Sequence, residues 1–263
     1  MPTDEAGQIT LDTPDALLGC ILDMGEVLLS NGAEIVRVED TLTRLCAAYG
    51  FTDINVFCIT SSIVLTAQTL DGRIITQTRR ITSRNTNLEM IANVNSLSRQ
   101  LCCKPVNVAD FQEKVFEILQ TKTYSQPIQC LSYAVISAAF SVFFGGSAWD
   151  AVAAAISGLL VFAIQHYLKK LKLNGLLYSL LASALTALVV VLMVRIGIGD
   201  TPEKINIGNI MLLIPGVAFT TSLRDLTNGD TLSGIVGLSE AVIKSIAIAI
   251  GFAAVLVGIG GIL

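Results

Sequence analysis

The chain has 263 residues, of which 52% are hydrophobic and 14% charged, and its mean hydropathy is +0.68. Soluble domains ordinarily carry about 25% charged residues, so this composition excludes a wholly water-soluble protein and predicts a part embedded in lipid. The net charge is −4. Most charged residues lie in the first 123 positions, which predicts a water-soluble first half and a membrane-embedded second half.

The N-terminal stretch 1–15 has acidic residues and no Lys or Arg, so we expect no secretory signal there. Thr13 and Pro14 are typical of a helix start. From Leu18 to Cys46 apolar residues recur at helical spacing, interrupted by Ser30-Asn31-Gly32. This pattern predicts two helices, or one helix kinked at that triplet.

The pattern then changes to that of β-strands. Residues 54–70 are rich in alternating β-branched side chains, and Asp71-Gly72 provides a turn before a further strand at 73–81. Helical spacing returns at 87–102 and 108–121. Residues 1–125 are therefore predicted to form an α+β domain.

Six cysteines are scattered through the chain without C-x-x-C spacing; they are Cys20, Cys46, Cys58, Cys102, Cys103 and Cys130. We interpret all six as reduced side chains that fill the interior. The sequence predicts no metal, no cofactor and no nucleic-acid partner.

Residues 126–263 are predicted to form a transmembrane helical domain of about five spans. The candidate spans are 127–144, 149–167, 176–197, 205–223 and 242–263. Each is long enough to cross a hydrocarbon core of about 30 Å at about 1.5 Å per residue. The fold class is thus a membrane protein with an N-terminal cytoplasmic α+β domain.

Basic residues before the first span, at Lys169, Lys170 and Lys172, and at Arg224 indicate the cytoplasmic side. With five spans this places the N-terminus inside and the C-terminus outside.

The densest polar segment of the second half runs from residue 215 to 231. Pro215 and Gly216 interrupt the fourth span, which predicts freed carbonyls near Ile210 and Met211 that could line a cavity. A simple kink, with boundary charges that only mark topology, is the alternative. The predicted substrate or ion path comprises Pro215, Gly216, Thr220, Ser222, Arg224, Asp225, Asp230, Glu240 and Lys244.

Glu240 and Lys244 are four residues apart and can pair on one helix face. They are either functional groups within the span, with Glu240 a possible proton site, or ordinary interfacial residues.

In the soluble half, Glu34, Arg37 and Glu39 form a charged motif after the Ser30-Asn31-Gly32 triplet. Arg37 could bridge Glu34 and Asp40 on one helix face. This motif is either a surface ion-pair network or a site that docks onto the membrane half or shapes an entrance.

These segments resemble the threonine/serine exporter family. The likeness rests on Ser30-Asn31-Gly32-Ala33-Glu34, Arg37-Val38-Glu39, Asp71-Gly72-Arg73, Asn93-Val94-Asn95-Ser96-Leu97-Ser98-Arg99, Pro215-Gly216, Ser222-Leu223-Arg224-Asp225-Leu226, Gly229-Asp230, Ser233-Gly234 and Glu240-Ala241. The motifs occur in matching order over nearly the whole chain. The family pattern has an arginine where this chain has Gly237, so no role transfers to that position.

The resemblance implies secondary export of small polar metabolites, driven by the proton motive force, across a bacterial inner membrane. It also implies a split form in which a larger subunit like this chain works with a small membrane partner, and such pairs are associated with succinate. Single-chain members have about ten spans. We therefore expect a small membrane-protein partner, a homo-oligomer, or both.

The leading hypothesis is an exporter subunit for threonine, serine or a small dicarboxylate such as succinate. Arg224 is the candidate for a substrate carboxylate, and Asp225, Asp230 or Glu240 for an ammonium group or a proton. The alternative is a membrane-anchored sensor or scaffold whose soluble domain binds a cytoplasmic ligand or protein. An enzyme is disfavoured, because His166 is the lone histidine and no nucleotide-binding or hydrolase motif is present.

Overall fold

The computed structural model describes residues 13–121, 124–171 and 173–260. Within these residues the chain forms α1 (Pro14–Ser30), α2 (Ile35–Ala48), β1 (Thr52–Ile59), β2 (Ser62–Gln68), β3 (Ile74–Arg80), α3 (Leu88–Cys103), α4 (Val108–Leu119), α5 (Gln126–Phe143), α6 (Ala148–Lys170), α7 (Gly175–Arg195), α8 (Pro202–Ile210), α9 (Gly216–Thr227) and α10 (Thr231–Gly260).

The chain divides into two compact units. Unit 1 comprises Met1–Thr121 and Val217–Leu238, and unit 2 comprises Lys122–Gly216 and Ser239–Leu263. Unit 1 thus includes the α9 segment and the start of α10 in addition to the N-terminal elements. A cut at residue 125 between a soluble and a membrane domain remains a prediction.

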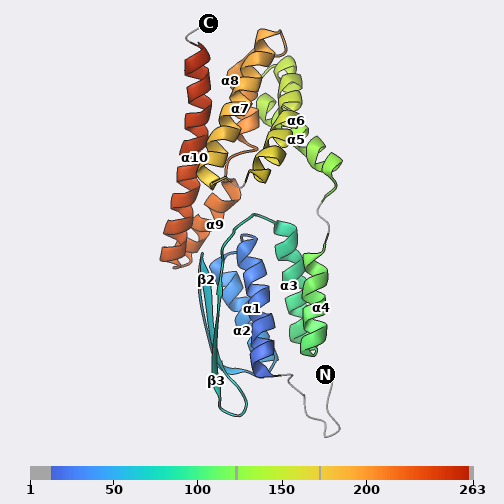
Figure 1. Cartoon of the computed structure of the whole chain (residues 1–263), viewed down its shortest axis with the longest axis vertical. Helices are drawn as coiled ribbons and strands as arrows, with labels where there is room; N and C mark the ends of the chain where they lie inside the picture. Colours follow the sequence, from blue (N-terminus) through green and yellow to red (C-terminus); the bar gives the residue numbers. More distant parts are fainter. Residues whose placement is uncertain (1–12, 122–123, 172, 261–263) are drawn as a thin grey trace. The chain divides into compact units, whose positions relative to one another are not determined.

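Unit 1 contains a three-stranded antiparallel sheet with strand order β1-β2-β3. Helix α2 packs on β1, and α1 packs on β2 and β3, while α3 and α4 pack in turn against these helices (Figure 1). The strand pattern predicted for residues 54–70 is resolved into β1 and β2, which a tight turn joins after Ile59. Helices and a small antiparallel sheet are thus present in the N-terminal half, as predicted.

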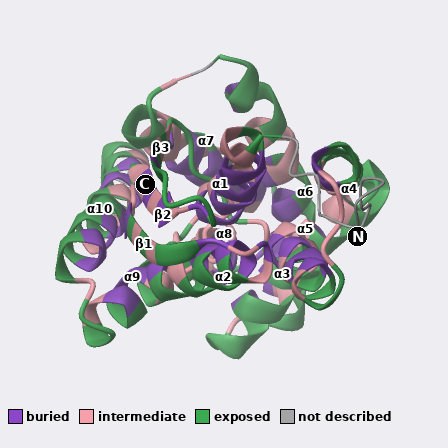
Figure 2. Ribbon diagram, turned by 90° about the horizontal axis from the view of Figure 1, so that it is seen from below, coloured by how far each residue is buried: buried purple, intermediate pink, exposed green. Residues whose placement is uncertain are grey.

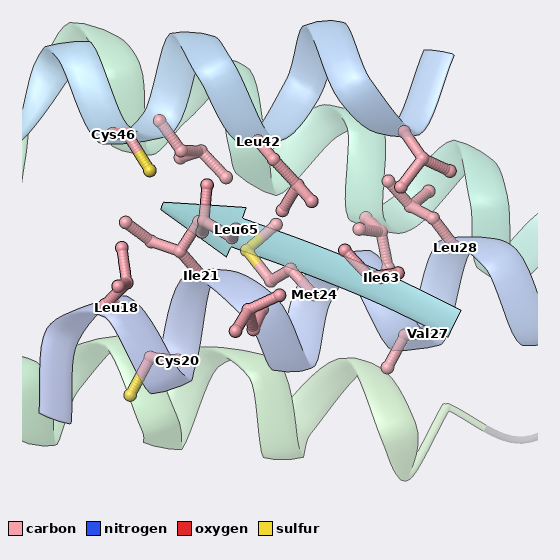
Figure 3. Close-up of a cluster of buried hydrophobic side chains, with 14 of the residues drawn as sticks. Leu18, Cys20, Ile21, Met24, Val27, Leu28, Leu42, Cys46, Ile63 and Leu65 are labelled. Carbon is pink, nitrogen blue, oxygen red and sulfur yellow. The ribbon is translucent and has the colours of Figure 1, made fainter. Parts of the chain in front are cut away.

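Large aliphatic side chains fill the interior of unit 1 (Figure 3). Ile21, Met24 and Leu28 of α1 meet Leu42 of α2 and Ile63 of β2, and each of these side chains is fully buried. Their spacing of three and four residues on α1 places them on one helix face. Burial of each such side chain contributes about 1.5–3 kcal/mol.

The predicted interruption at Ser30-Asn31-Gly32 separates two helices. Gly32 has a φ of 91°, which a residue with a Cβ adopts only with strain. Close packing adds a second requirement, because the backbone carbonyl of Asn85 lies 3.2 Å from the position that a Gly32 Cβ would take. The triplet therefore ends α1 and fixes the entry into α2.

Unit 2 is helical, and α5, α6, α7 and α8 pack on one another. Its interior is lined by small side chains. Ala153, Ala154 and Ala187 are fully buried, as are Ser137 and Ser183. Such residues let helix backbones approach closely, as in membrane helix bundles.

Four helices of the described part of the chain are long and apolar enough to cross a membrane. They are α5, α6, α7 and α10, which correspond to four of the five predicted spans. Helix α10 begins at Thr231, earlier than the predicted start at 242. The last residues of that predicted span, 261–263, lie outside the described residues.

The predicted fourth span, residues 205–223, does not form a single helix. This segment forms α8, of 9 residues, and α9, of 12 residues, with a turn between them. Proline lacks a backbone N–H and disfavours a helical residue before it, so the helix ends ahead of Pro215. Neither short helix has the length of a span.

Large apolar side chains are exposed on the long helices, whereas α1 is mostly buried (Figure 2). On α10, exposed positions include Ile235, Ile243, Ile246, Ile250 and Val257. A continuous apolar exterior of this kind indicates contact with lipid or another helix. The fold is therefore that of a multi-pass membrane protein with a small sheet near its N-terminus.

Candidate functional site

Two of the charged residues that the sequence indicated meet in unit 1, although they are 190 positions apart. Nη1 of Arg224, on α9, lies 2.7 Å from Oε1 of Glu34, the residue just before α2. The Glu34 side chain is 18% exposed and the Arg224 side chain 60%. Arg37 lies farther from the same oxygen, at 4.0 Å. Glu34, of the motif that follows Ser30-Asn31-Gly32, therefore forms the ion pair with Arg224 of the 215–231 segment.

The neighbouring Asp225 is almost fully buried, with 2% of its surface exposed. Its Oδ1 accepts a hydrogen bond of 3.2 Å from the backbone N–H of Ile35, in the first turn of α2. This N–H is one of the donors that a helix start leaves without an internal partner. Asp225 thus binds the N-terminus of α2, one residue beyond the Glu34 ion pair.

Burial raises the pKa of Asp225 above the ordinary aspartate value. The hydrogen bond from Ile35 opposes this shift, the negative charges of Asp230 and Glu34 add to it, and the positive charge of Arg84 opposes it. A raised pKa favours the protonated form of the carboxyl group at a higher pH than in water.

Glu39 has a similar environment. Its Oε1 accepts a hydrogen bond of 2.9 Å from the backbone N–H of Cys58 in β1. Burial raises the pKa of Glu39, the Cys58 bond opposes this, and the charge of Asp230 adds to it. Burial also raises the pKa of the Cys58 thiol to about 12, so this cysteine stays protonated.

Asp230 lies between α9 and α10, and its backbone N–H donates to the carbonyl of Asp225. Its Oδ2 is buried and has no hydrogen-bond partner within the described part of the chain. We call Glu34, Glu39, Arg224, Asp225 and Asp230 the acid–arginine cluster. It combines carboxyl groups that are held in a desolvated setting with one guanidinium that is open to solvent.

The hydroxyl groups of α9 bond to their own helix. Oγ1 of Thr220 donates to the carbonyl of Val217, and Oγ of Ser222 to that of Ala218. Ser222 also lies against Gly237 of α10, where any added Cβ would overlap its Oγ. Contact between α9 and α10 therefore leaves no room for a side chain at position 237.

Pro215 and Gly216 mark the turn between α8 and α9, as the interruption predicted. The carbonyl of Ile210, however, is not free, because it accepts from the N–H groups of Leu213 and Ile214. For Ile210 the predicted freed carbonyl is therefore not found, since a tight turn satisfies it locally; for Met211, whose helical partner would be the N–H that Pro215 lacks, it stays a prediction.

Of the ion pairs that helix spacing allowed, Arg37–Glu34 is present at 4.0 Å, and two others are not found among the described residues. Among the described residues no ion pair joins Glu240 to Lys244, both of which lie in unit 2; the Lys244 Cε instead lies beside the start of α7, near Gly175. Arg37 does not bridge two acids either, because Asp40 pairs with Arg44 at 2.8 Å. Spacing on a helix allows a pair, but competing partners decide which one forms.

Sequence reasoning missed several polar residues in the interior of unit 2. Asp150, at the start of α6, accepts hydrogen bonds from the backbone N–H groups of Ser147, Asp200 and Thr201. Asn206 and Asn209 of α8 are both buried. Their spacing of three residues inside a predicted apolar span was the signal that could have identified them.

A separate groove of about 440 Å³ opens in unit 1 between α1 and α4. Cys20, Val27, Phe111 and Val115 form part of its apolar lining, with Asp23 also present. None of the predicted site residues lines it.

The sequence of this chain matches a known protein family. The pattern of a family described as "Putative threonine/serine exporter" matches residues 20–258. The chain belongs to the threonine/serine exporter family. All five residues of the acid–arginine cluster lie within the matched region.

Curated relatives are distant in sequence. The chain is 25% identical to the "Probable succinate transporter subunit YjjP" of Klebsiella aerogenes, over 85% of this chain and 86% of the relative. The protein of the same name from Escherichia coli is 24% identical over 88% of this chain and 90% of the relative.

The "Probable threonine/serine exporter" of Mycobacterium tuberculosis is 22% identical over 89% of this chain, but the match spans 45% of that relative. The chain thus matches the YjjP proteins over most of their length and the exporter over about half. No solved structure matches the chain significantly.

Proposed function

We propose that this chain is one subunit of a secondary exporter of small polar metabolites, either threonine and serine or a small dicarboxylate such as succinate. The proton motive force is the proposed driving force. The observation that carries this proposal is the acid–arginine cluster, in which family motifs 190 positions apart bring Arg224 to Glu34 and Asp225 to Ile35.

Arg224 is the proposed contact for a substrate carboxylate. A guanidinium has five N–H donors, and the hydrogen bond to Glu34 uses one of them. The side chain is 60% exposed, so a solute carboxylate can reach it and compete with Glu34. Bidentate binding would favour the solute, because a planar fork matches a carboxylate.

Asp225 and Glu39 are the proposed proton-binding groups. Burial is the largest cause of the raised pKa of each carboxyl group, and the charge of Asp230 raises both. Proton uptake by either carboxyl would reduce the negative charge around Arg224. This coupling would link the protonation state of the cluster to anion binding.

A small membrane partner is part of the proposal. It is supported by the word "subunit" in the names of the relatives that this chain matches over most of their length. We further propose an inner-membrane location with the N-terminal α+β domain in the cytoplasm, which the distribution of Lys and Arg supports.

The test is efflux of labelled threonine, serine and succinate from proteoliposomes with an imposed proton gradient. The chain is assayed alone and with candidate small membrane partners. We expect gradient-dependent efflux that Arg224→Ala reduces at least about tenfold, the equivalent of one charge-assisted hydrogen bond of about 1.4 kcal/mol. Arg44→Ala is the matched control, because Arg44 is exposed and pairs with Asp40 outside the cluster.

Absence of efflux for every solute, with folded and partnered protein, would reject the exporter proposal. Unchanged efflux in Arg224→Ala would reject only the role of Arg224.

The groove between α1 and α4 favours a second candidate function, that of a membrane-anchored sensor. An apolar groove of about 440 Å³ has the size of a small-molecule site. Val27→Trp, which would fill the groove, should abolish a ligand response of a sensor and leave efflux by an exporter unchanged.

A further inference from the structure

Helix α9 reverses the burial pattern of a helix that faces water. Its buried residues are both polar, Ser222 and Asp225. Its large apolar side chains Val217, Phe219 and Leu223 are between 42% and 47% exposed. A helix that faces water buries its apolar stripe and exposes polar residues, so the exposed side of α9 suits an apolar medium.

Helix α2, of similar length and in the same unit, shows the ordinary pattern. It has 14 residues, and α9 has 12. Its buried residues include Val38, Leu42 and Leu45, whereas Arg44 and Asp40 form an ion pair on its exposed side. The reversal is therefore a property of α9 rather than of every short helix in unit 1.

The first turns of α10 pack tightly on α9. A Cβ at Gly234 would overlap Leu226, and a Cβ at Gly237 would overlap Ser222. Residue numbers thus rise along one helix as they fall along the other, so residues 217–238 form an antiparallel helical hairpin within unit 1. Contact through small residues is typical of helices in membranes.

The first turns of α10 show the same reversal as α9. Leu232, Ile235 and Val236 are exposed, whereas Ser233 is buried. Residues 231–238 include no charged side chain. Both helices of the hairpin thus turn large apolar side chains outward and small or polar residues inward.

The hairpin leads directly into a membrane span. Helix α10 has the length and hydropathy of a span and begins within the hairpin, at Thr231. Its 30 residues measure about 45 Å at about 1.5 Å per residue, which exceeds a hydrocarbon core of about 30 Å by about ten residues. Glu240 and Lys244, the charged residues of α10, follow the first turns and suit a membrane boundary. The hairpin therefore stands where this helix leaves the hydrocarbon core.

We propose that the hairpin surface of Val217, Phe219, Leu223, Ile235 and Val236 inserts into the headgroup and upper acyl region of the lipid bilayer. One corner of unit 1 thereby contacts the membrane directly, without crossing it. The apolar side of an amphipathic helix enters this region to a depth of about 5–10 Å. The inference concerns lipid contact and does not depend on the identity of the exported solute.

This contact determines the surroundings of the acid–arginine cluster. Arg224 follows Leu223 on α9 and is 60% exposed, so its guanidinium lies at the level of the headgroups, where long basic side chains are favoured. Asp225 lies on the buried side of the same helix. In this arrangement the cluster lies at the membrane surface, and a solute approaches Arg224 along the lipid–water interface.

The experiment measures tryptophan emission of the full chain in phosphatidylcholine liposomes, with and without bromine on the acyl chains near the headgroup. Trp149 is the only tryptophan, so Trp149→Phe is the background of every variant. Leu223→Trp and Ile235→Trp place the probe on the hairpin. Leu70→Trp is the matched control, because Leu70 is an exposed apolar residue of unit 1 that follows β2.

Bromine quenches tryptophan only at close range. We expect the two hairpin probes to lose most of their emission in brominated lipid and to emit at a shorter wavelength than the control, which should keep its emission. This result supports the proposal.

Emission typical of water at the hairpin, unaffected by bromine, overturns the proposal, as does equal quenching of the control. Short-wavelength emission without quenching also overturns it, because a second copy of the chain or another protein then covers the hairpin. Phe219→Trp, which replaces one aromatic ring by another, provides the test if Leu223→Trp does not fold. Efflux is measured separately, so failure here leaves the exporter proposal untouched.

Discussion

The interiors of the two units differ in the size of the side chains that fill them. The largest fully buried side chains of the described structure all lie in unit 1, among them Phe111, Leu17 and Met24. In unit 2, the fully buried positions include Ala153, Ala182 and Ser183, while large side chains such as Leu160 and Ile246 are exposed. Compared with unit 1, unit 2 thus has more small side chains in its interior and more large apolar side chains on its exterior, a partial inversion.

This difference is the one expected if unit 1 faces water and unit 2 faces lipid. Water drives large apolar side chains into a core, so unit 1 hides them. Lipid provides no such drive, and helices there associate through close backbone contact and hydrogen bonds. The polar groups also differ: the cluster of unit 1 holds several charged side chains and is partly exposed, whereas the buried polar side chains of unit 2 include the amides Asn206 and Asn209 and one carboxylate, Asp150.

The sharpest test of this contrast is the same substitution in both units. Leu42→Ala removes a fully buried side chain from unit 1 and should lower the free energy of unfolding of that unit by about 2–5 kcal/mol. Leu160→Ala changes a side chain of α6 that is 41% exposed and should have a much smaller effect. Hydrogen exchange of amides in each unit, with the protein in detergent, measures both. Equal effects would contradict the inversion.

Close helix contact in unit 2 predicts a strong effect of a single added methyl group. At Gly208 a Cβ would overlap the backbone carbonyl of Ser137, whereas at Gly258 it would meet nothing within 4 Å. Gly208→Ala should therefore cost about 1–3 kcal/mol of unit 2 stability, and Gly258→Ala, the control, should be neutral or slightly stabilising. Thermal unfolding in detergent compares the pair, and two equally stable variants would refute tight α5–α8 packing.

The acid–arginine cluster predicts a pH dependence of unit 1. Because the pKa of Asp225 is raised in the folded state, the folded protein binds this proton more tightly than the unfolded chain. Its contribution to stability is therefore present at low pH and is lost as pH rises from the ordinary aspartate range through the folded-state pKa. Asp225→Asn keeps the acceptor for Ile35 and should be more stable than the wild type at neutral pH.

The measurement is the unfolding free energy of unit 1 by hydrogen exchange between pH 4 and 8, a range of about four units around the relevant carboxyl values. The wild type should lose more stability with rising pH than Asp225→Asn. Parallel pH curves for the two proteins would show that Asp225 does not titrate as proposed.

The smallest expected effect concerns the Glu34–Arg224 ion pair. Since Arg224 is 60% exposed, Glu34→Gln should change unit 1 stability by only about 0.2–1 kcal/mol. If Glu34 competes with a solute carboxylate, the same variant should bind solute more tightly. Asp40→Asn, which breaks the exposed pair with Arg44, is the control and should leave solute affinity unchanged.

Much of the local structure could be predicted from the sequence. Pro14 and Gly32 indicated where α1 begins and ends. Proline restricts φ to a value that suits a helix start, and glycine can adopt the positive φ found at position 32. Long runs of apolar residues identified α5, α6, α7 and most of α10. The interruption at Pro215 was also visible, although the sequence did not show that it separates two short helices, α8 and α9.

The contacts that assemble the candidate sites could not be predicted. Residue spacing allowed Arg37 to bridge Glu34 and Asp40, but Arg44 took Asp40 and Arg224 took Glu34. Each choice depends on which residues the fold brings within about 3 Å, a property of tertiary packing rather than of helix periodicity.

The amino-acid sequence by itself predicted two kinds of environment and determined most of the order of helices and strands, because hydropathy and backbone preference act over a few neighbouring residues. Only the tertiary structure decided that Asp225 lies on the first turn of α2 and that the buried amide of Asn206 has no hydrogen-bond partner among the residues the structure describes. Both depend on packing between segments far apart in the chain, where burial and competing hydrogen bonds determine which polar groups meet.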